Sequence, residues 1–234
     1  MSGGANDTSP KPKQRRLRAA VRRGHVLDAA LALFSERGYR ASMDEIAKAS
    51  GVTRTVLYYY FPSKRELFLA VQERQVTEFL RHVAPAISSR GPAEDRVRTT
   101  LDALLGFAES EPRGWDIVFD RSDAHEPDVA DVRARTRSML KATVTALLAE
   151  DIERLGLDPD SLQVDLLFDV AVAGIVEGVS WWRRTPSVDR ESMLQSLAEP
   201  LSRGLVGIEQ AAPGAGLTRA RPLGARSGDV GRAR

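Results

Sequence analysis

Cysteine is absent from this chain of 234 residues. Its absence excludes disulfide bonds, a thiolate metal site and a cysteine nucleophile, and it is in keeping with a reducing cytoplasm. Histidine is scarce, with three copies in separate predicted elements. The G-x-S-x-G, P-loop and dinucleotide-binding motifs are missing as well. We therefore predict no catalytic residue, no metal site and no cofactor, and we expect that the protein is not an enzyme.

Long apolar runs are also missing. No stretch reaches the roughly 20 residues that a membrane-spanning helix requires, and the polar amino terminus lacks the apolar centre of a signal peptide. We therefore expect a cytoplasmic protein without membrane contact. The period-2 alternation that is typical of strands does not occur over any length, so the predicted fold class is all-α.

The net charge of +2 hides a strong division along the chain. Residues 1–65 hold 13 Lys and Arg against 5 Asp and Glu, a net charge of +8. Residues 66–209 carry −10, and residues 210–234 carry +4. A basic head on an acidic body indicates that only the head meets a polyanion.

The stretch SMDEIAKASGVTRTVLYYYFPSK, residues 42–64, predicts two short helices joined by a turn. Ser42 and Glu45 form a capping box for the first helix, and Gly51 supplies a left-handed turn position. Thr53 caps the second helix, whose outer face is polar and aromatic. This arrangement is typical of a helix-turn-helix that reads the major groove of DNA.

The second helix carries most of the predicted DNA contacts. Its inward positions are Leu57 and Phe61. The groove-facing positions are Arg54, Thr55, Val56 and Tyr59, and those beside the backbone phosphates are Tyr58, Tyr60 and Lys64. Ser42 and Met43, at the start of the first helix, complete the predicted set. The alternative is an ordinary helical hairpin inside a core, which three adjacent tyrosines directed to solvent oppose.

The residues from Gly51 to Phe68 also follow the pattern G-V-T-R-x-x-L-Y-x-Y-F-P-S-K-x-x-L-F. This pattern resembles the DNA-binding signature of the tetracycline-repressor (TetR) family of transcriptional regulators. The preceding segment HVLDAALALFSERGY is similar to that family's first helix, so the resemblance covers roughly residues 20–70. Many members have Gly or Pro in place of Thr55 and Thr in place of Val56, so the operator sequence cannot be transferred from relatives.

We predict four parts of the chain, namely a disordered basic arm (1–21), a DNA-binding domain (22–82, with the helix-turn-helix at 42–61), a helical effector-binding and dimerisation domain (83–209) and a disordered tail (210–234). The expected helices outside the motif cover residues 22–37, 63–83, 93–109, 113–119, 127–155, 161–184 and 187–209. Pro85 and the residues 88–92 are expected to break the chain. The arm is either a solvated tail or a segment that follows the phosphates.

The helix at 161–184 is apolar on more than one face, which predicts a second partner besides the monomer core. Gly174 and Gly178, one turn apart, would let another backbone approach closely. The resemblance implies a homodimer that pairs through the last two long helices as a four-helix bundle. The predicted interface residues are Ala171, Gly174, Ile175, Gly178, Leu197 and Leu201. A helix buried entirely in its own core is the alternative.

A ligand pocket is predicted among large side chains of the body. Its candidate residues are Phe107, Trp115, Phe119, Met139, Phe168, Glu177 and Trp181. Ordinary core packing is the alternative for each aromatic residue, and Glu177 either faces the cavity or pairs with Arg183 or Arg184. The resemblance implies a small-molecule effector that releases DNA. The acidic segment 120–126 contains one imidazole, His125, so we expect a solvated loop there and no metal site.

These observations favour a dimeric, sequence-specific transcriptional regulator, specifically a repressor that a small effector releases from a palindromic operator. It would be associated with the nucleoid when bound to DNA. Two alternatives remain open at this point. One is a transcriptional activator, and the other is a helical ligand-binding module or enzyme whose head only localises it.

Overall fold

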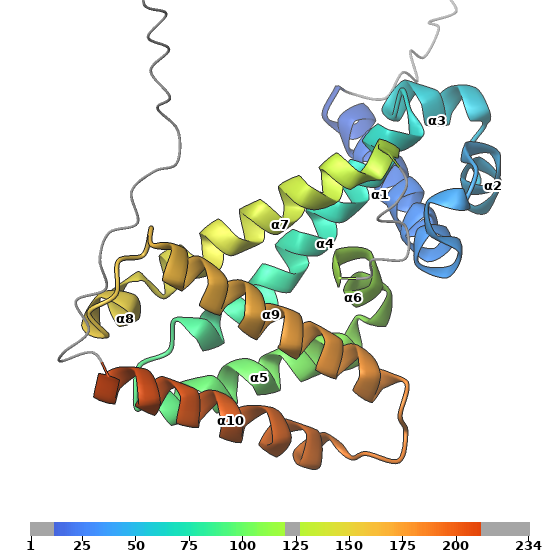
Figure 1. Cartoon of the computed structure of the whole chain (residues 1–234). Coiled ribbons are helices and arrows are strands. Elements are labelled where there is room, and N and C mark those ends of the chain that lie inside the picture. Colours follow the sequence, from blue (N-terminus) through green and yellow to red (C-terminus); the bar gives the residue numbers. More distant parts are fainter. Residues whose placement is uncertain (1–11, 120–126, 212–234) are drawn as a thin grey trace, which may run out of the picture.

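The computed structural model describes residues 12–119 and 127–211, and every regular element within these ranges is a helix (Figure 1). The elements are α1 (Pro12–Arg37), the 3-10 helix η1 (Gly38–Arg40), α2 (Met43–Ala49), α3 (Arg54–Tyr60), α4 (Lys64–Ile87), α5 (Ala93–Ser110), α6 (Pro112–Phe119), α7 (Pro127–Leu147), α8 (Ala149–Arg154), α9 (Leu162–Arg183) and α10 (Arg190–Ala211). The predicted all-α class is confirmed. None of the helices in the described ranges is long and apolar enough to cross a bilayer.

The helix starts of the motif follow the predicted caps. The Ser42 hydroxyl accepts from the main-chain N–H of Glu45 at 3.2 Å, and the Glu45 carboxylate accepts from the main-chain N–H of Ser42 at 2.8 Å. Thr53 caps α3 by accepting from the N–H of Val56 at 3.3 Å. Ser63 caps α4 in the same manner. These side chains satisfy N–H groups that have no partner within the helix, so each helix begins where its cap lies.

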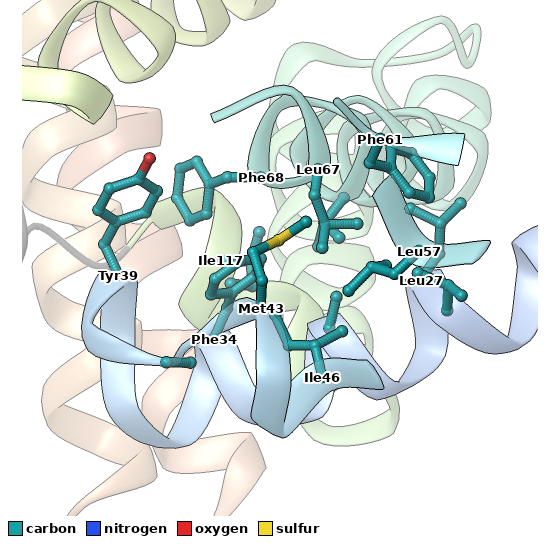
Figure 2. Packing of buried hydrophobic residues seen from close by; sticks show 14 of the residues in the cluster. Leu27, Phe34, Tyr39, Met43, Ile46, Leu57, Phe61, Leu67, Phe68 and Ile117 are labelled. Carbon is teal, nitrogen blue, oxygen red and sulfur yellow. The ribbon is translucent and has the colours of Figure 1, made fainter. Parts of the chain in front are cut away.

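The head, which we define as α1, η1, α2, α3 and the first two turns of α4, surrounds one apolar cluster (Figure 2). Phe68 of α4 is at its centre, with its ring edge-on to Phe34 at 5.2 Å and to Tyr39 at 5.4 Å between ring centroids. The cluster also contains Ile117 of α6, and Val129 and Val132 of α7. The head core is therefore completed by helices that follow it in the chain.

The body has a second cluster, formed by α4, α5, α6, α9 and α10. Its fully buried members include Leu105, Phe107 and Trp115. On α4, the head cluster ends at Val71 and the body cluster begins at Phe79. The helix itself runs unbroken between them and alongside α7 (Figure 1). Head and body are thus joined by a continuous helix, without a linker.

The first helix is longer than predicted. It begins at Pro12, whereas residues 12–21 were expected to belong to a disordered arm. Proline is well accepted at the first helical position because its missing N–H would have no partner there. The Lys, Arg, Gln, Leu and Ala residues that follow are good helix formers. The rest of the predicted arm (1–11), the acidic segment (120–126) and the tail from residue 212 lie outside the described residues.

Three other helix boundaries differ from the prediction. Helix α4 continues through Pro85 to Ile87, and α10 begins at Arg190 and not at residue 187, although it runs through Pro200 as predicted. A proline removes one N–H and strains one turn, and in α4 only half a turn remains after it. The single helix expected over 127–155 is interrupted at Leu148, after which α8 forms a separate turn. An ion pair between α5 and α8 holds α8 in its position. Arg96 of α5 donates to both carboxylate oxygens of Asp151, at 2.6 and 2.5 Å.

Candidate nucleic-acid interface

The turn between α2 and α3 depends on Gly51. Its φ of +68° lies in the left-handed region that side chains disfavour. The main-chain N–H of Val52 then returns to the carbonyl of Ala47 at 3.1 Å, which closes the end of α2. A side chain at residue 51 would meet no atom within 4 Å, so the requirement for glycine here is one of backbone conformation and not of space.

Helix α3 has one buried and one exposed face. Leu57 is fully buried, and Phe61 directly after the helix is also in the head core. Arg54, Thr55 and Tyr59 are exposed, with 81 % of the Tyr59 surface accessible. The predicted inward and outward directions of these residues agree with the structure. In Figure 1, α3 lies at the outer end of the head, remote from α5 and α10.

The exposed face of α3 is partly ordered by contacts among its own side chains and with one side chain of α2. Arg54 forms an ion pair with Asp44 of α2, with 3.1 Å between Nη1 and Oδ2. The guanidinium of Arg54 also lies 5.5 Å from the ring centroid of Tyr58, one turn further along α3. Tyr59 and Tyr60 pack edge-on at 5.4 Å. Tyr60 is half-buried against the head core, so the three tyrosines are exposed to different degrees.

Lys64 begins α4 at the edge of this surface. Its ammonium group donates to the main-chain oxygen of Tyr39 at 2.7 Å and lies 4.0 Å from the ring centroid of the same residue. The guanidinium of Arg23 of α1 lies over the ring of Phe61, directly after α3, at 5.0 Å from the ring centroid. Two cations thus border α3 from α1 and α4, where a positive charge can attract phosphate.

Not every predicted DNA-binding residue reaches the surface. Met43 is buried, with 7 % of its surface exposed, so its place in the predicted set is wrong. As the first residue of α2 it turns into the head core, beside Ile46 (Figure 2). Ser42 is exposed, but its hydroxyl is occupied as the cap of α2. Val56 is half-buried.

Asp44 is a residue of this surface that the sequence prediction missed. It lies ten positions before Arg54, and no periodicity relates two residues on different short helices. The neighbouring Glu45 has a different role. The hydrogen bonds that Glu45 accepts from the main chain and hydroxyl of Ser42, together with the nearby charge of Arg37, hold the pKa of Glu45 below its usual value. Glu45 is therefore ionised at neutral pH while it caps α2.

The structure brings together only some of the predicted pocket residues. The ring centroids of Trp115 and Phe119 of α6 lie 4.4 Å apart. Phe79 packs between Phe119 and Phe107, with centroid distances of 5.1 and 5.3 Å. Phe168 of α9 is half-buried beneath the ammonium group of Lys141. Phe107, Trp115 and Phe119 therefore form one aromatic group, with Phe79 as a member that the sequence prediction did not include.

Three other pocket candidates lie at the surface of the chain. Met139 and Trp181 are exposed by 44 % and 48 %. The Glu177 side chain is 79 % exposed and pairs with Arg184 at 3.5 Å, which is one of the two partners considered from the sequence. Within one chain, the prediction that Met139, Trp181 and Glu177 surround a common interior is therefore wrong. For Glu177 and Trp181 it failed because α9 packs on the body core through Val179 and Trp182 instead.

The predicted interface residues also divide between two surroundings. Gly174 faces open space, whereas a side chain at Gly178 would meet Met193 and Leu197 of the same chain at 3.3 and 3.4 Å. The close approach at Gly178 is thus made by the chain's own α10, contrary to the prediction. Leu197 and Leu201 are half-buried against the body core, and Ala171 and Ile175 are half-buried on α9. The large apolar residues that α9 does expose are Leu162, Leu166, Leu167, Val170 and Trp181.

A metal centre has no support in residues 12–119 and 127–211, where no group of three or more His, Asp or Glu side chains could hold an ion. The surface that remains as a candidate site is the exposed face of α3 with its basic borders.

Comparisons with known proteins bear on this surface. Residues 26–71 match the model of the family described as bacterial regulatory proteins, tetR family. This range covers the last 12 of the 26 residues of α1, the helix-turn-helix and the first third of α4. It therefore contains the whole exposed face of α3 and Lys64 of α4, whereas Arg23 of α1 precedes it.

Similarity extends beyond the head. The transcriptional activator FasR of Mycolicibacterium smegmatis is 32% identical over 187 residues, which is 79% of this chain and 83% of that protein. A TetR-like regulator from Rhodococcus sp. RHA1 superimposes with a TM-score of 0.58 at 26% identity, over 80% of this chain and 97% of the other. FadR from Bacillus subtilis, solved with stearoyl-CoA, has a TM-score of 0.62 at 18% identity, over 78% of this chain and 97% of the other.

Proposed function

Since this chain belongs to the TetR family of bacterial transcriptional regulators, we propose that it acts as a homodimer on a palindromic operator and responds to a small effector. As a family member it is a DNA-binding helix-turn-helix regulator and not an enzyme. The alternative of an enzyme whose head only localises it is therefore set aside. The observation that carries the proposal is the exposed face of α3 within residues 1–65, which have a net charge of +8.

In this proposal, α3 enters the major groove with Arg54, Thr55 and Tyr59 toward the base edges. These side chains are exposed on the face opposite Leu57. An arginine can donate two hydrogen bonds to the O6 and N7 atoms of guanine, and the methyl group of threonine can contact thymine. Lys64 at the start of α4 and Tyr58 on the flank of α3 meet the backbone phosphates, which position the helix without reading sequence.

The homodimer is supported by the exposed apolar face of α9. Leu162, Leu166 and Val170 follow one another at a spacing of four residues, and Gly174 continues this line of the helix with open space above it. A monomer would leave this face in water, although apolar contact area is what usually stabilises association. A two-fold dimer would cover it and would present two α3 helices to half-sites about 34–36 Å apart.

We propose that the effector contains a long apolar portion, and stearoyl-CoA is the first compound to test. Two observations support this class. FadR from Bacillus subtilis was solved in complex with that thioester. In this chain, Phe79, Phe107, Trp115 and Phe119 form an apolar aromatic group between α4, α5 and α6, and the first three of them are buried.

Helix α6 gives the effector a route to the head. It is held to α9 by a hydrogen bond from the Trp115 indole to the Ser180 hydroxyl at 3.2 Å, and by an ion pair of 2.6 Å between Asp116 and Arg183. Its residue Ile117 is part of the head core. A molecule that displaces α6 would therefore disturb the packing that orients α3.

We propose repression as the direction of regulation, because a dimer seated on an operator near a promoter excludes RNA polymerase from that DNA. Activation is the second candidate, and the similarity to the activator FasR favours it.

The test is footprinting of purified protein on the DNA that flanks its own gene, followed by transcription in vitro from the footprinted promoter. A protected palindrome and reduced transcript support repression, and increased transcript supports activation. Absence of any protected palindrome in this DNA and in a randomised duplex pool would refute the proposed function.

A further inference from the structure

An exposed carboxylate on a surface that meets DNA requires an explanation, because it repels the phosphates. The first turn of α2 contains two acidic residues, Asp44 and Glu45. Glu45 is engaged in the capping box and in an ion pair of 2.7 Å with Arg37. Asp44 takes no part in this cap and is directed to the other side, where its carboxylate meets Arg54 of α3.

The guanidinium of Arg54 has two neighbours with different roles. The Asp44 carboxylate accepts from Nη1 at 3.1 Å, and the Tyr58 ring lies 5.5 Å away on the same helix. Both charged side chains are more than 60 % exposed. An ion pair this exposed contributes little to the stability of a fold. Its consequence is instead conformational, because a planar guanidinium held on one edge and one face loses much of its rotational freedom.

A guanidinium has five N–H groups, and a carboxylate on one edge leaves others to donate outward. Arg54 is the first residue of α3 and its side chain is 65 % exposed, so the N–H groups that do not bond to Asp44 are accessible to a DNA duplex on this face. A side chain ordered before binding loses less entropy when it contacts a base. The charge of Asp44 is also partly neutralised, which reduces its repulsion of phosphate.

We propose that Asp44 is a specificity-determining positioning residue, which orients Arg54 so that its free N–H groups read one guanine in each half-site. This inference rests on the proposed placement of α3 in the major groove. Asp44 is not itself a base-contacting residue in this arrangement, and Tyr58 backs the guanidinium from the other side.

The experiment is binding-site selection from a randomised duplex pool with the full-length wild-type protein and with the Asp44→Ala, Arg54→Ala and doubly substituted variants. Affinities are then measured for the duplex that the wild type selects and for a scrambled duplex. Asp28→Ala is the matched control, because Asp28 of α1 also forms an ion pair with an arginine, Arg74, at 2.8 Å, and lies outside α2 and α3. Both substitutions remove one negative charge from the head.

We expect Asp44→Ala to lose the preference for guanine at the same position that Arg54→Ala loses, with no further loss in the double variant. Affinity for the selected duplex falls by about fivefold or more, which is the lower end of what one base contact contributes. Affinity for the scrambled duplex does not fall, because the head has gained positive charge. The Asp28→Ala variant keeps the wild-type motif. Circular dichroism verifies folding, and the isosteric Asp44→Asn variant is used if Asp44→Ala does not fold.

Two results would overturn the inference. An unchanged motif with equal gains in affinity for both duplexes means that Asp44 only repels phosphate. If Asp44→Ala loses the preference at a different base pair, and its loss of affinity adds to that of Arg54→Ala, then Asp44 contacts a base directly. A carboxylate can do so by accepting from the amino group of cytosine. An unchanged motif in Arg54→Ala would instead refute the base-reading role of Arg54, and failure of the wild type to select any motif would refute the proposed function.

Discussion

The Gln72 side chain of α4 donates a hydrogen bond of 3.1 Å to the main-chain oxygen of Ile117 in α6. That carbonyl lies in the last turn of α6, where no N–H of the helix can reach it. The Thr136 hydroxyl of α7 donates to the Gln72 side-chain oxygen at 3.0 Å, which orients the amide. Gln72 is fully buried between the head core and the body core. One amide thus links three helices at the junction of head and body.

The first prediction tests this junction. Replacing Thr136 with Val keeps the shape of the side chain but leaves the Gln72 oxygen without its donor inside the protein. A buried acceptor left unpaired costs roughly 1–3 kcal/mol, so we expect the free energy of unfolding to fall by that amount. Urea unfolding at fixed protein concentration, followed by circular dichroism, measures it. In the control Thr99→Val, an exposed hydroxyl of α5 is lost, and the change should stay within about 0.5 kcal/mol. Equal losses in both variants would contradict the assignment.

The second prediction concerns phosphate contacts at Lys64. Because phosphate neutralisation releases counterions, log K for operator binding should fall linearly as log salt rises. Lys64→Ala removes one cation, so the slope should become shallower by about 1 while the selected motif stays the same. Titrations at several salt concentrations measure both quantities. The Lys64 ammonium also donates to the Tyr39 carbonyl, so a melting curve must show that the variant is folded. A changed motif would indicate that Lys64 reads bases.

The third prediction tests the α9 face. Val170 is 71 % exposed in one chain, and a glutamate there would place a charge in the proposed dimer contact. We expect Val170→Glu to yield a monomer by light scattering and to weaken operator binding, because each half-site is then bound singly. The matched control is Met139→Glu on α7, where a large apolar residue is also exposed. A dimeric Val170→Glu variant with full operator affinity would place the interface elsewhere.

The fourth prediction concerns coupling between the two sites. If stearoyl-CoA binds near Trp115, it should quench tryptophan fluorescence and weaken operator binding. Linkage requires that operator DNA weaken the binding of the thioester by the same factor, and a coupling of about 1–3 kcal/mol is typical. Calorimetric titration with and without the selected duplex measures this factor. Equal affinities in the two titrations would mean that the thioester does not control DNA binding.

The fifth prediction follows from the ion pair that holds α8. Hydrogen bonds from Arg96, and then its charge, hold the pKa of Asp151 below its ordinary value of 3.8, against the opposing effect of partial burial. A depressed folded-state pKa means that the stabilisation is present above the ordinary value and is lost as the pH falls below it. Asp151→Asn should therefore destabilise the protein at pH 6, and its difference from the wild type should shrink near pH 3. Urea unfolding at both pH values measures this difference, with Asp95→Asn at an exposed position of α5 as the control.

The local features of the head were predictable from the sequence. The caps at Ser42, Thr53 and Ser63 and the turn at Gly51 depend on residues no more than a few positions apart. The buried stripe that includes Leu57 follows from helical periodicity for the same reason. The helix limits near Pro12, Pro85 and Leu148 were less predictable. Favourable tertiary contacts can outweigh the local preference of a residue for or against a helix.

The surroundings of individual side chains were decided by the tertiary structure. Met43 is buried, Gly178 faces its own α10, and Asp44 meets Arg54. Each of these facts depends on how one helix lies against another.

The sequence by itself thus determined the helical class, which is expressed in apolar periodicity along the chain, and the motif and the family, which are expressed in the caps and spacing of one short stretch. Only the tertiary structure decided which face of α9 is left uncovered, and that Ile117, Val129 and Val132 complete the head core. The physical reason is that an apolar residue gains free energy from burial against any suitable apolar neighbour. A pattern of apolar positions therefore shows that one face of a helix will be buried. Which helix buries it depends on how helices that are distant in the chain pack against each other.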